Sequence, residues 1–193
     1  MHRRPRRPTS DVPVNKFGLT SHADLQWRET PLALRRLLEL QLNPIAGEFD
    51  TKHLRAIHRY IFQDVYDWAG ELRTVSISKP GAAFPPPDYL QANLDALFAG
   101  LARENWLKNL SAPTWAQRAA YFLGEINAIH PFREGNGRTQ REFIRELAHA
   151  GGHLLLWPGV SQQEMILASQ LSFLRQDYSA LERILIAALD ASG

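Results

Sequence analysis

The feature that most constrains the fold of this chain is the helical spacing of its apolar residues, which recurs along most of its length. Only one stretch, residues 71–87, instead alternates apolar and polar side chains as a β-strand does. The predicted helices cover about residues 30–42, 50–70, 88–104, 114–129, 137–150, 161–173 and 181–189. The sequence therefore predicts a mostly α fold, a helical bundle with one small β-hairpin.

Capping residues indicate where two of these helices begin. Thr30 can cap a helix whose first residue is Pro31, because proline suits the first helical position. Asp50 is the expected cap of the second helix, which is predicted to stop at Gly70.

The strand-like stretch has a turn in its middle. Val75 and Ile77 alternate with hydroxyl side chains, and a Lys-Pro-Gly turn follows at residues 79–81. The chain then continues to Phe84 and three prolines. We therefore expect a hairpin that stands out from the helices as a flap.

Length and composition indicate a single domain. The chain has 193 residues, of which 45% are apolar and 22% are charged, enough for one well-buried core. We expect this domain to span residues 13–193. Residues 1–12 are rich in Arg and Pro and have little to bury, so they are expected to form a disordered basic tail.

Charge, cysteine content and hydropathy exclude several classes of protein. Four arginines in the tail exceed the formal net charge of +2, so the rest of the chain is not a basic platform and direct nucleic-acid binding is not expected. The chain has no cysteine, which excludes disulfides and fits a reducing compartment. No apolar run approaches bilayer length. We expect a soluble cytoplasmic protein without membrane attachment.

The stretch HPFREGNGRTQR at residues 130–141 collects the parts of a phosphate-transfer site between two predicted helices. Its turn at residues 135–137 brings backbone N–H groups together at a helix N-terminus, which favours an anion. Arg138 and Arg141 are three apart on the following helix, so both can reach the outer phosphates of a nucleotide.

Three further side chains of this stretch have expected roles. Glu134 beside the anion site would repel phosphate unless a cation stood between them, which points to Mg²⁺. His130 is the nearby side chain that can take a proton at neutral pH. Phe132 is expected to anchor the loop in the core. Each residue alone is common in structural roles, but their combination indicates nucleotide chemistry.

Other well-known nucleotide and metal motifs do not fit. The chain lacks G-x-x-x-x-G-K-[ST] and H-E-x-x-H, and a G-x-G-x-x-G pattern breaks at Gln140. His53 and His58 are five apart and so lie on different faces of their helix. We interpret these two histidines as incidental and not as metal ligands.

Residues 130–141 match every fixed position of the signature H-x-F-x-[D/E]-G-N-G-R-x-x-R, and the chain therefore resembles the Fic family of protein adenylyltransferases. The stretches 73–79 and 84–87 look like the flap hairpin of that family, and residues 16–20 look like its entry segment. The resemblance spans about residues 14–190. It implies a Fic-type helical bundle with the hairpin as a flap.

The resemblance also implies a reaction, the transfer of AMP from ATP to a Ser, Thr or Tyr hydroxyl of a target protein. His130 would deprotonate that hydroxyl, and Glu134 would hold Mg²⁺. The residues that would bind the phosphates of ATP are Arg133, Gly135, Asn136, Gly137, Arg138 and Arg141. Weaker candidates for contact with ATP or its adenine are Lys16, Phe17 and Gly81.

The flap would dock the target, because an exposed strand offers unpaired backbone groups to an extended segment. The residues expected to form this docking edge are Thr74, Val75, Ser76, Ile77, Ser78, Lys79 and Phe84. A hairpin with a purely structural role is the other interpretation of this stretch.

Regulation is the last expectation from the resemblance. Many Fic proteins contain a self-inhibiting helix with the pattern [S/T]-x-x-x-E-[G/N], which this sequence lacks. The chain then resembles bacterial Fic toxins whose inhibitory helix is supplied by a separate small antitoxin, with its glutamate expected on Arg138. Several such toxins modify type II topoisomerases. A larger effector containing this domain would be translocated out of the bacterium.

Two alternative functions remain open at this point. The phosphate site does not reveal the base, so a Fic enzyme that transfers another nucleoside monophosphate or phosphocholine is one alternative. A non-catalytic interaction module that uses the Arg-rich tail is the other, although the complete motif weighs against it.

Overall fold

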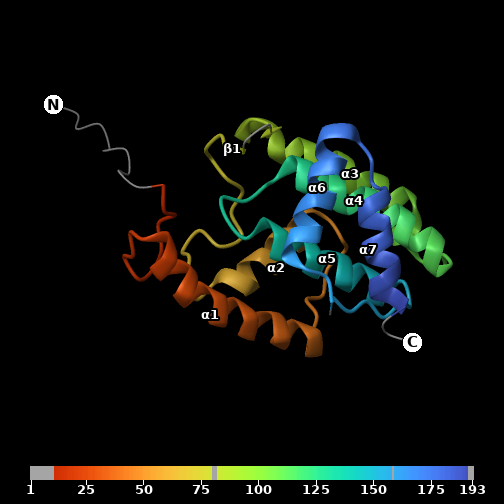
Figure 1. Ribbon diagram of the computed structural model, residues 1–193, viewed down its shortest axis with the longest axis horizontal. Helices are drawn as coiled ribbons and strands as arrows, with labels where there is room; N and C mark the ends of the chain where they lie inside the picture. The colour runs from red at the N-terminus through yellow and green to blue at the C-terminus, as the bar shows by residue number, and fades with distance from the viewer. Residues whose placement is uncertain (1–10, 80–81, 158, 191–193) are drawn as a thin grey trace.

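Helices make up nearly all the regular structure of this protein (Figure 1). A computed structural model describes residues 11–79, 82–157 and 159–190. The described helices are α1 (His22–Leu42), α2 (Thr51–Phe62), α3 (Leu90–Arg103), α4 (Ala112–Ile129), α5 (Asn136–Ala150), α6 (Gln162–Arg175) and α7 (Ser179–Asp190), with two short 3₁₀ helices at Pro87–Tyr89 and Asn105–Leu107. The predicted mostly α fold is therefore confirmed.

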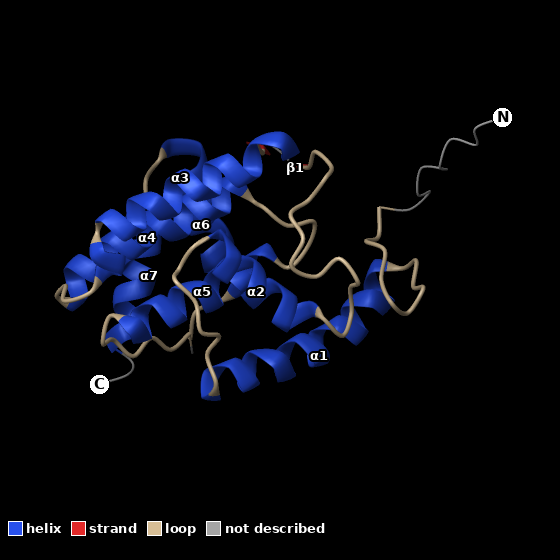
Figure 2. Ribbon diagram, turned by 180° about the vertical axis from the view of Figure 1, so that it is seen from behind, coloured by secondary structure: helices blue, strands red, loops and turns tan. Residues whose placement is uncertain are grey.

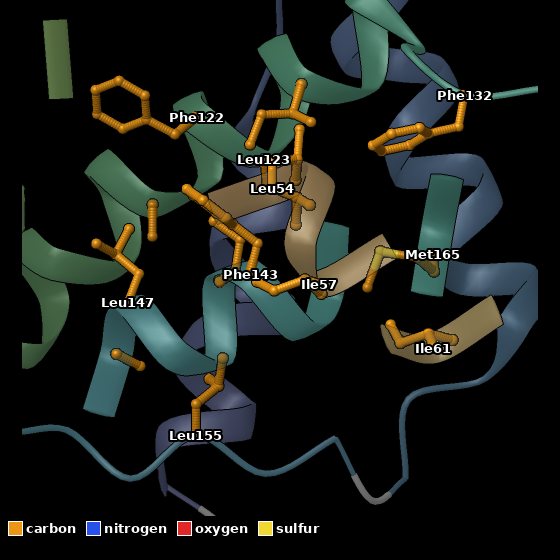
Figure 3. Packing of buried hydrophobic residues seen from close by; sticks show 14 of the residues in the cluster. Leu54, Ile57, Ile61, Phe122, Leu123, Phe132, Phe143, Leu147, Leu155 and Met165 are labelled. Atoms are coloured by element: carbon orange, nitrogen blue, oxygen red, sulfur yellow. The ribbon is translucent and has the colours of Figure 1, made fainter. Parts of the chain in front are cut away.

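Helix α4 lies at the centre of the bundle and contacts α3, α5, α6 and α7, while α2 packs against α1, α3 and α5. The core between these helices is apolar and closely interleaved (Figure 3). Leu54 and Ile57 of α2 meet Phe143 of α5 there, and Trp115 of α4 is fully buried. This packing fixes the two helix ends, those of α4 and α5, between which residues 130–135 run.

Helix α1 runs along one edge of the bundle and begins earlier than its sequence suggests (Figure 2). Its cap is Ser21, whose hydroxyl accepts a hydrogen bond from the backbone N–H of Asp24, so the predicted start at Thr30 is wrong. Pro31 lies inside the helix and costs it one backbone hydrogen bond. Burial of side chains on both sides of the proline, Leu25 before it and Ala33 after it, keeps the helix continuous.

Helix α2 ends at Phe62, and the prediction that it continues to Gly70 is wrong. Turns follow, and Gly70 with φ of +86° lies close against Arg55 and Arg59 of α2. There its backbone N–H donates to the Nδ1 atom of His58 at 2.8 Å. The apolar spacing of residues 63–70 reflects packing of these turns on the helix, which a helical pattern cannot distinguish from more helix.

The predicted flap contains very little strand. Ser78 pairs with Ala83 and Lys79 with Ala82, forming β1 (Ser78–Lys79) and β2 (Ala82–Ala83) in antiparallel order. Residues 74–77 are not in a strand, so the expected extended edge over them is absent from the part that the structure describes. Val75 is 48% exposed, which leaves these residues without the packing that would hold a strand.

Two further expectations concern the ends of the chain and the membrane. Residues 1–10 of the predicted tail lie outside the described residues, and Val12 is buried. Among the described helices, none is both long and apolar enough to cross a membrane.

Candidate active site

The motif residues meet around one cavity of about 990 Å³. Its lining includes His130 at the end of α4, Glu134 in the following loop, and Arg138 and Arg141 on the first turns of α5. Phe84 of the flap and several residues of α1 and α6 complete its walls. The structure thus brings the sequence-predicted base, carboxylate and arginines together.

His130 is held in an uncommon backbone conformation at the end of α4. Its φ of 48° and ψ of 63° are left-handed, a region that non-glycine residues rarely adopt. The Nδ1 atom lies 3.3 Å from the carbonyl oxygen of Asn127, and the ring of Phe84 stacks on the imidazole at 4.3 Å. If Nδ1 carries the proton of that hydrogen bond, Nε2 is the basic nitrogen.

The loop that joins the two helices is closed by its own residues. The side-chain amide of Asn136 accepts from the backbone N–H of Phe132 and donates to its carbonyl oxygen. Phe132 is 1% exposed, which confirms its predicted role as a core anchor. Since the amide of Asn136 is used within the loop, any contribution of this residue to anion binding comes from its backbone.

The loop of residues 131–135 packs closely against helix α2. Gly135 has φ of +78°, and a Cβ at that position would lie 2.3 Å from the ring of Phe62. The guanidinium of Arg138 also lies over the Phe62 ring, at 4.7 Å from its centre. The backbone therefore approaches α2 so closely that only glycine fits.

His58, interpreted from sequence as incidental, is fully buried under the loop. Its Nδ1 atom accepts from the backbone N–H of Gly70, so Nε2 must carry the proton that is donated to the carbonyl oxygen of Glu134 at 3.1 Å. Its ring also stacks on Phe132 at 3.9 Å. Burial, with a smaller contribution from the nearby Arg138 charge, outweighs the hydrogen bond to Glu134 and lowers the pKa of His58 to about 4, so the ring is neutral at physiological pH.

The two motif arginines differ in their partners. Arg141 is partly buried and lines the cavity, and burial, followed by the neighbouring charge of Arg138, lowers its pKa. Arg138 donates to a carboxylate oxygen of Glu29, a buried residue of α1, at 2.5 Å. The other oxygen of Glu29 accepts from the hydroxyl of Tyr66. Burial and this hydrogen bond raise the pKa of Tyr66.

The resemblance implies that Arg138 binds the glutamate of a separate antitoxin. In the structure Arg138 is instead paired with Glu29 of its own chain. Glu29 is followed by Thr30 and therefore does not match the inhibitory pattern, in which glutamate precedes glycine or asparagine. The two partners are 109 residues apart in sequence. No local pattern signals a contact of that range.

The carboxylate of Glu134 is placed to serve as one ligand of a magnesium ion. It is exposed to the cavity, and one of its oxygens accepts from the backbone N–H of Gly135 at 3.0 Å. Within the described ranges no three acidic or histidine side chains form a cluster that could hold a metal on its own. Mg²⁺ does not need such a cluster, because it is often held by one or two carboxylates and the phosphates of a nucleotide.

The weaker candidates for adenine contact do not lie together at the cavity. The ammonium group of Lys16 donates to the carbonyl oxygen of Gln63 at 2.7 Å, and Phe17 lines a separate cavity against α1. Gly81 lies outside the described residues. Of the predicted docking residues, Ile77, Ser78 and Phe84 line the cavity. Thr74, Val75 and Ser76 are exposed and are not part of its lining, and the side chain of Lys79 is outside the described part.

Comparison with known proteins identifies the family. Residues 48–148 match the model of the Fic/DOC family, which is more than half of the chain. This chain belongs to the Fic/DOC family. The match includes α2, the flap and the whole motif.

Relatives confirm the predicted enzyme class, Fic-type protein adenylyltransferase. The chain is 42% identical over 166 residues to the protein adenylyltransferase VbhT of Bartonella schoenbuchensis, which is 86% of this chain and 35% of that protein. It is 32% identical over 186 residues to the probable protein adenylyltransferase Fic of Escherichia coli, covering 96% of this chain and 92% of that protein. The chain thus spans about a third of VbhT and nearly all of the second relative.

Solved structures share the fold. The N-terminal Fic domain of a VirB-translocated effector protein from Bartonella quintana, with bound ADP, superposes with a TM-score of 0.85 at 26% identity. That alignment covers 93% of this chain and 91% of the other. The bundle of this chain is therefore the Fic fold.

Proposed function

We propose that this protein transfers AMP from ATP to a Ser, Thr or Tyr hydroxyl of a target protein. The observation that carries the proposal is that His130, the first turn of α5 and Arg141 face one cavity. A base, an anion-binding helix N-terminus and a partly buried cation are the groups that such a transfer needs. The ADP in the Bartonella quintana relative supports a nucleotide as the occupant.

In this reaction Nε2 of His130 takes the proton of the target hydroxyl as its oxygen bonds to the α-phosphorus. The bond from that phosphorus to the β-phosphate oxygen breaks, and pyrophosphate leaves. Arg138 and Arg141 lie where they can bind the outer phosphates, and Arg133 and the backbone of residues 135–137 can bind the rest. Positioning and electrostatics dominate such a transfer.

The test is to incubate the protein with α-labelled ATP, GTP and UTP in a bacterial lysate and to follow label on protein. We expect label from ATP only, and its loss by about 1000-fold in His130→Ala, since a general base contributes this much. ADP binding, measured by calorimetry, should persist in the variant. Label from GTP or UTP would identify another nucleotide as donor, and equal labelling by His130→Ala would refute the mechanism.

Mg²⁺, held by Glu134 and the phosphates, would offset the negative charge of the triphosphate when bound. We predict that Glu134→Ala lowers the maximal labelling rate about 100-fold at saturating Mg²⁺. Exposed Glu71, which lies outside the cavity lining, provides the matched control through Glu71→Ala. An unchanged dependence of the rate on Mg²⁺ concentration in Glu134→Ala would place the cation elsewhere.

The flap is the proposed docking site of the target. The backbone beside Ile77 and Ser78 lies at the mouth of the cavity and can pair with an extended segment that carries the hydroxyl. A subunit of a type II topoisomerase is the proposed kind of target, on the resemblance to Fic toxins. Labelling of purified gyrase would test this choice independently of the chemistry.

Control by a separate small antitoxin is the remaining part of the proposal. Its support is the absence of the self-inhibiting motif from the sequence, together with the resemblance to Fic toxins that this absence implies. Because Glu29 already pairs with Arg138, an inhibitory glutamate on Arg138 would have to displace it. Expression of the chain alone should arrest bacterial growth, and co-expression of a partner carrying the motif should restore it. Harmless expression of an active protein would refute this control.

A further inference from the structure

Arg73 lies outside the signature and connects more parts of the site than any residue considered above. It is 4% exposed and stands where the chain leaves the turns after α2 and enters the flap. Among the described residues, the guanidinium of Arg73 donates its hydrogen bonds to backbone carbonyl oxygens. Burial alone lowers its pKa, as expected for a cation that has no carboxylate beside it.

One side of this guanidinium binds the end of α4. Its Nε atom donates to the carbonyl oxygen of His130 at 2.8 Å, and an Nη atom lies 3.4 Å from that of Ile129. The backbone N–H of Arg73 donates to the carbonyl oxygen of Pro131 at 2.9 Å. Carbonyls at a helix C-terminus lack helical partners, and a cation there is favoured by the helix dipole. Arg73 therefore holds the backbone on both sides of His130.

The other side of the guanidinium binds both limbs of the flap. One Nη atom donates to the carbonyl oxygen of Val75 at 2.9 Å, and the other to that of Pro85 at 2.6 Å. These carbonyls lie on the outgoing and the returning limb, and between them the described part of the flap has two strand pairs. Arg73 thus joins the two limbs at the base of the flap, as a longer ladder of strand hydrogen bonds would.

The two sets of contacts converge on the imidazole of His130. Phe84 precedes Pro85 on the returning limb, and its ring stacks on His130 at 4.3 Å. The backbone of His130 is left-handed, so its direction depends on contacts that hold it there. A single guanidinium accordingly fixes the backbone that carries the imidazole and the limb that carries the ring stacked on it.

We propose that Arg73 is a positioning residue that sets the His130 imidazole and the flap in register for transfer. The inference rests on the proposed function for its effect on rate, but not for its effect on the flap. A displacement of a reacting group by about 1 Å can lower a rate about 100-fold. Nucleotide binding should be spared, because Arg73 touches neither the first turn of α5 nor its arginines.

The experiment compares Arg73→Met and Arg73→Lys with the matched control Arg55→Met. Arg55 also donates to a backbone carbonyl of this connecting segment, that of Gly70 at 2.8 Å, but contacts neither His130 nor the flap limbs. Initial rates of protein labelling from α-labelled ATP in a bacterial lysate give an apparent maximal rate and a KM for ATP. Hydrogen exchange of the backbone amides over residues 74–85 is measured on the same proteins.

We expect Arg73→Met to lower the maximal rate about 100-fold, with the KM for ATP changed less than about threefold. Arg73→Lys should recover part of the rate, since lysine keeps the charge but cannot reach all four carbonyls. Exchange over residues 74–85 should accelerate in Arg73→Met and not in Arg55→Met. If wild type labels no protein, the proposed function fails, and the exchange result still decides the inference.

Two outcomes would overturn the inference. One is a folded Arg73→Met protein with the exchange pattern of wild type over residues 74–85. The other is an active wild type in which Arg73→Met and Arg55→Met lose the same fraction of rate and thermal stability, since Arg73 would then be a general structural residue.

Discussion

The two walls of the cavity that flank His130 are built very differently. The wall formed by residues 131–137 is tied to α2 and to itself by His58, by the side-chain amide of Asn136 and by the close approach of Gly135 to Phe62. The flap wall has two strand pairs and the carbonyl contacts of Arg73. The loop on the proposed nucleotide side is thus held by fixed contacts, whereas the backbone on the proposed target side can adapt to an incoming segment.

The largest effect is expected at Gly135, where the wall formed by residues 131–137 packs against Phe62 without space for a side chain. Gly135→Ala places a Cβ 2.3 Å from the Phe62 ring at a φ of +78°, so overpacking adds to backbone strain. We predict that it lowers the free energy of unfolding by about 4 kcal/mol and abolishes ADP binding. Urea denaturation and calorimetry measure the two effects.

Gly152→Ala is the matched control for this substitution. Gly152 has a φ of +83° but no atom within 4 Å of the added Cβ, so only the backbone strain of about 1 to 2 kcal/mol should appear. Equal losses of stability in the two variants would mean that Phe62 moves aside, and the loop would then be less rigid than the comparison above requires.

The second effect is a dependence of stability on pH that comes from His58. Its pKa is about 4 in the folded protein and near 6.5 in the unfolded chain, so the unfolded state binds more protons between these values. Stability is therefore full above pH 6.5 and falls as the pH decreases toward 4. At pH 5 the loss from this residue should be about 2 kcal/mol.

His58→Gln tests this prediction, since glutamine does not titrate in this range. The variant should be less stable than wild type at pH 7.5 but should lose about 2 kcal/mol less on transfer to pH 5. His149→Gln, at an exposed position of α5, is the control and should keep the wild-type difference. A His58→Gln protein with the full wild-type loss would show that other groups cause the pH dependence.

The motif loop could be predicted from sequence because its decisive contacts are local. Phe132 and Asn136 bond to each other across four residues, and Gly135 supplies the left-handed cap of α5 next to them. Residue types and spacing carry this information directly. The same is true of helices α3 to α7, whose apolar stripes predict their approximate extent.

The supports of that loop could not be predicted because they depend on contacts distant in sequence. His58 and Glu134 are 76 residues apart, and Arg73 and His130 are 57 apart. The predicted start of α1 is wrong for a related reason. Packing of its N-terminal turns on the bundle outweighs the local preference of Pro31 for the first position of a helix. Tertiary packing decided these positions.

The smallest effect concerns whether the nucleotide wall is complete before ATP arrives. Glu29 is 6% exposed and places a negative charge on Arg138 at the position where the outer phosphates are proposed to bind. Glu29→Gln keeps a hydrogen-bonding group beside Arg138 and Tyr66 but removes that charge. We predict that ATP binds about fivefold more tightly, or by about 1 kcal/mol, because Arg138 is partly exposed and its charge is screened.

Calorimetry with ATP on wild type, Glu29→Gln and Glu39→Gln decides this prediction. Glu39 lies on the same helix and also accepts from an arginine, Arg36 at 2.8 Å, but it is not part of the cavity wall. Its substitution should leave the affinity for ATP unchanged. If Glu29→Gln instead weakens ATP binding, the carboxylate serves to hold Arg138 in place, and the nucleotide wall is complete in the free protein. Tighter binding would mean that ATP must first displace a charge of the protein, so that part of this wall is finished only by the nucleotide.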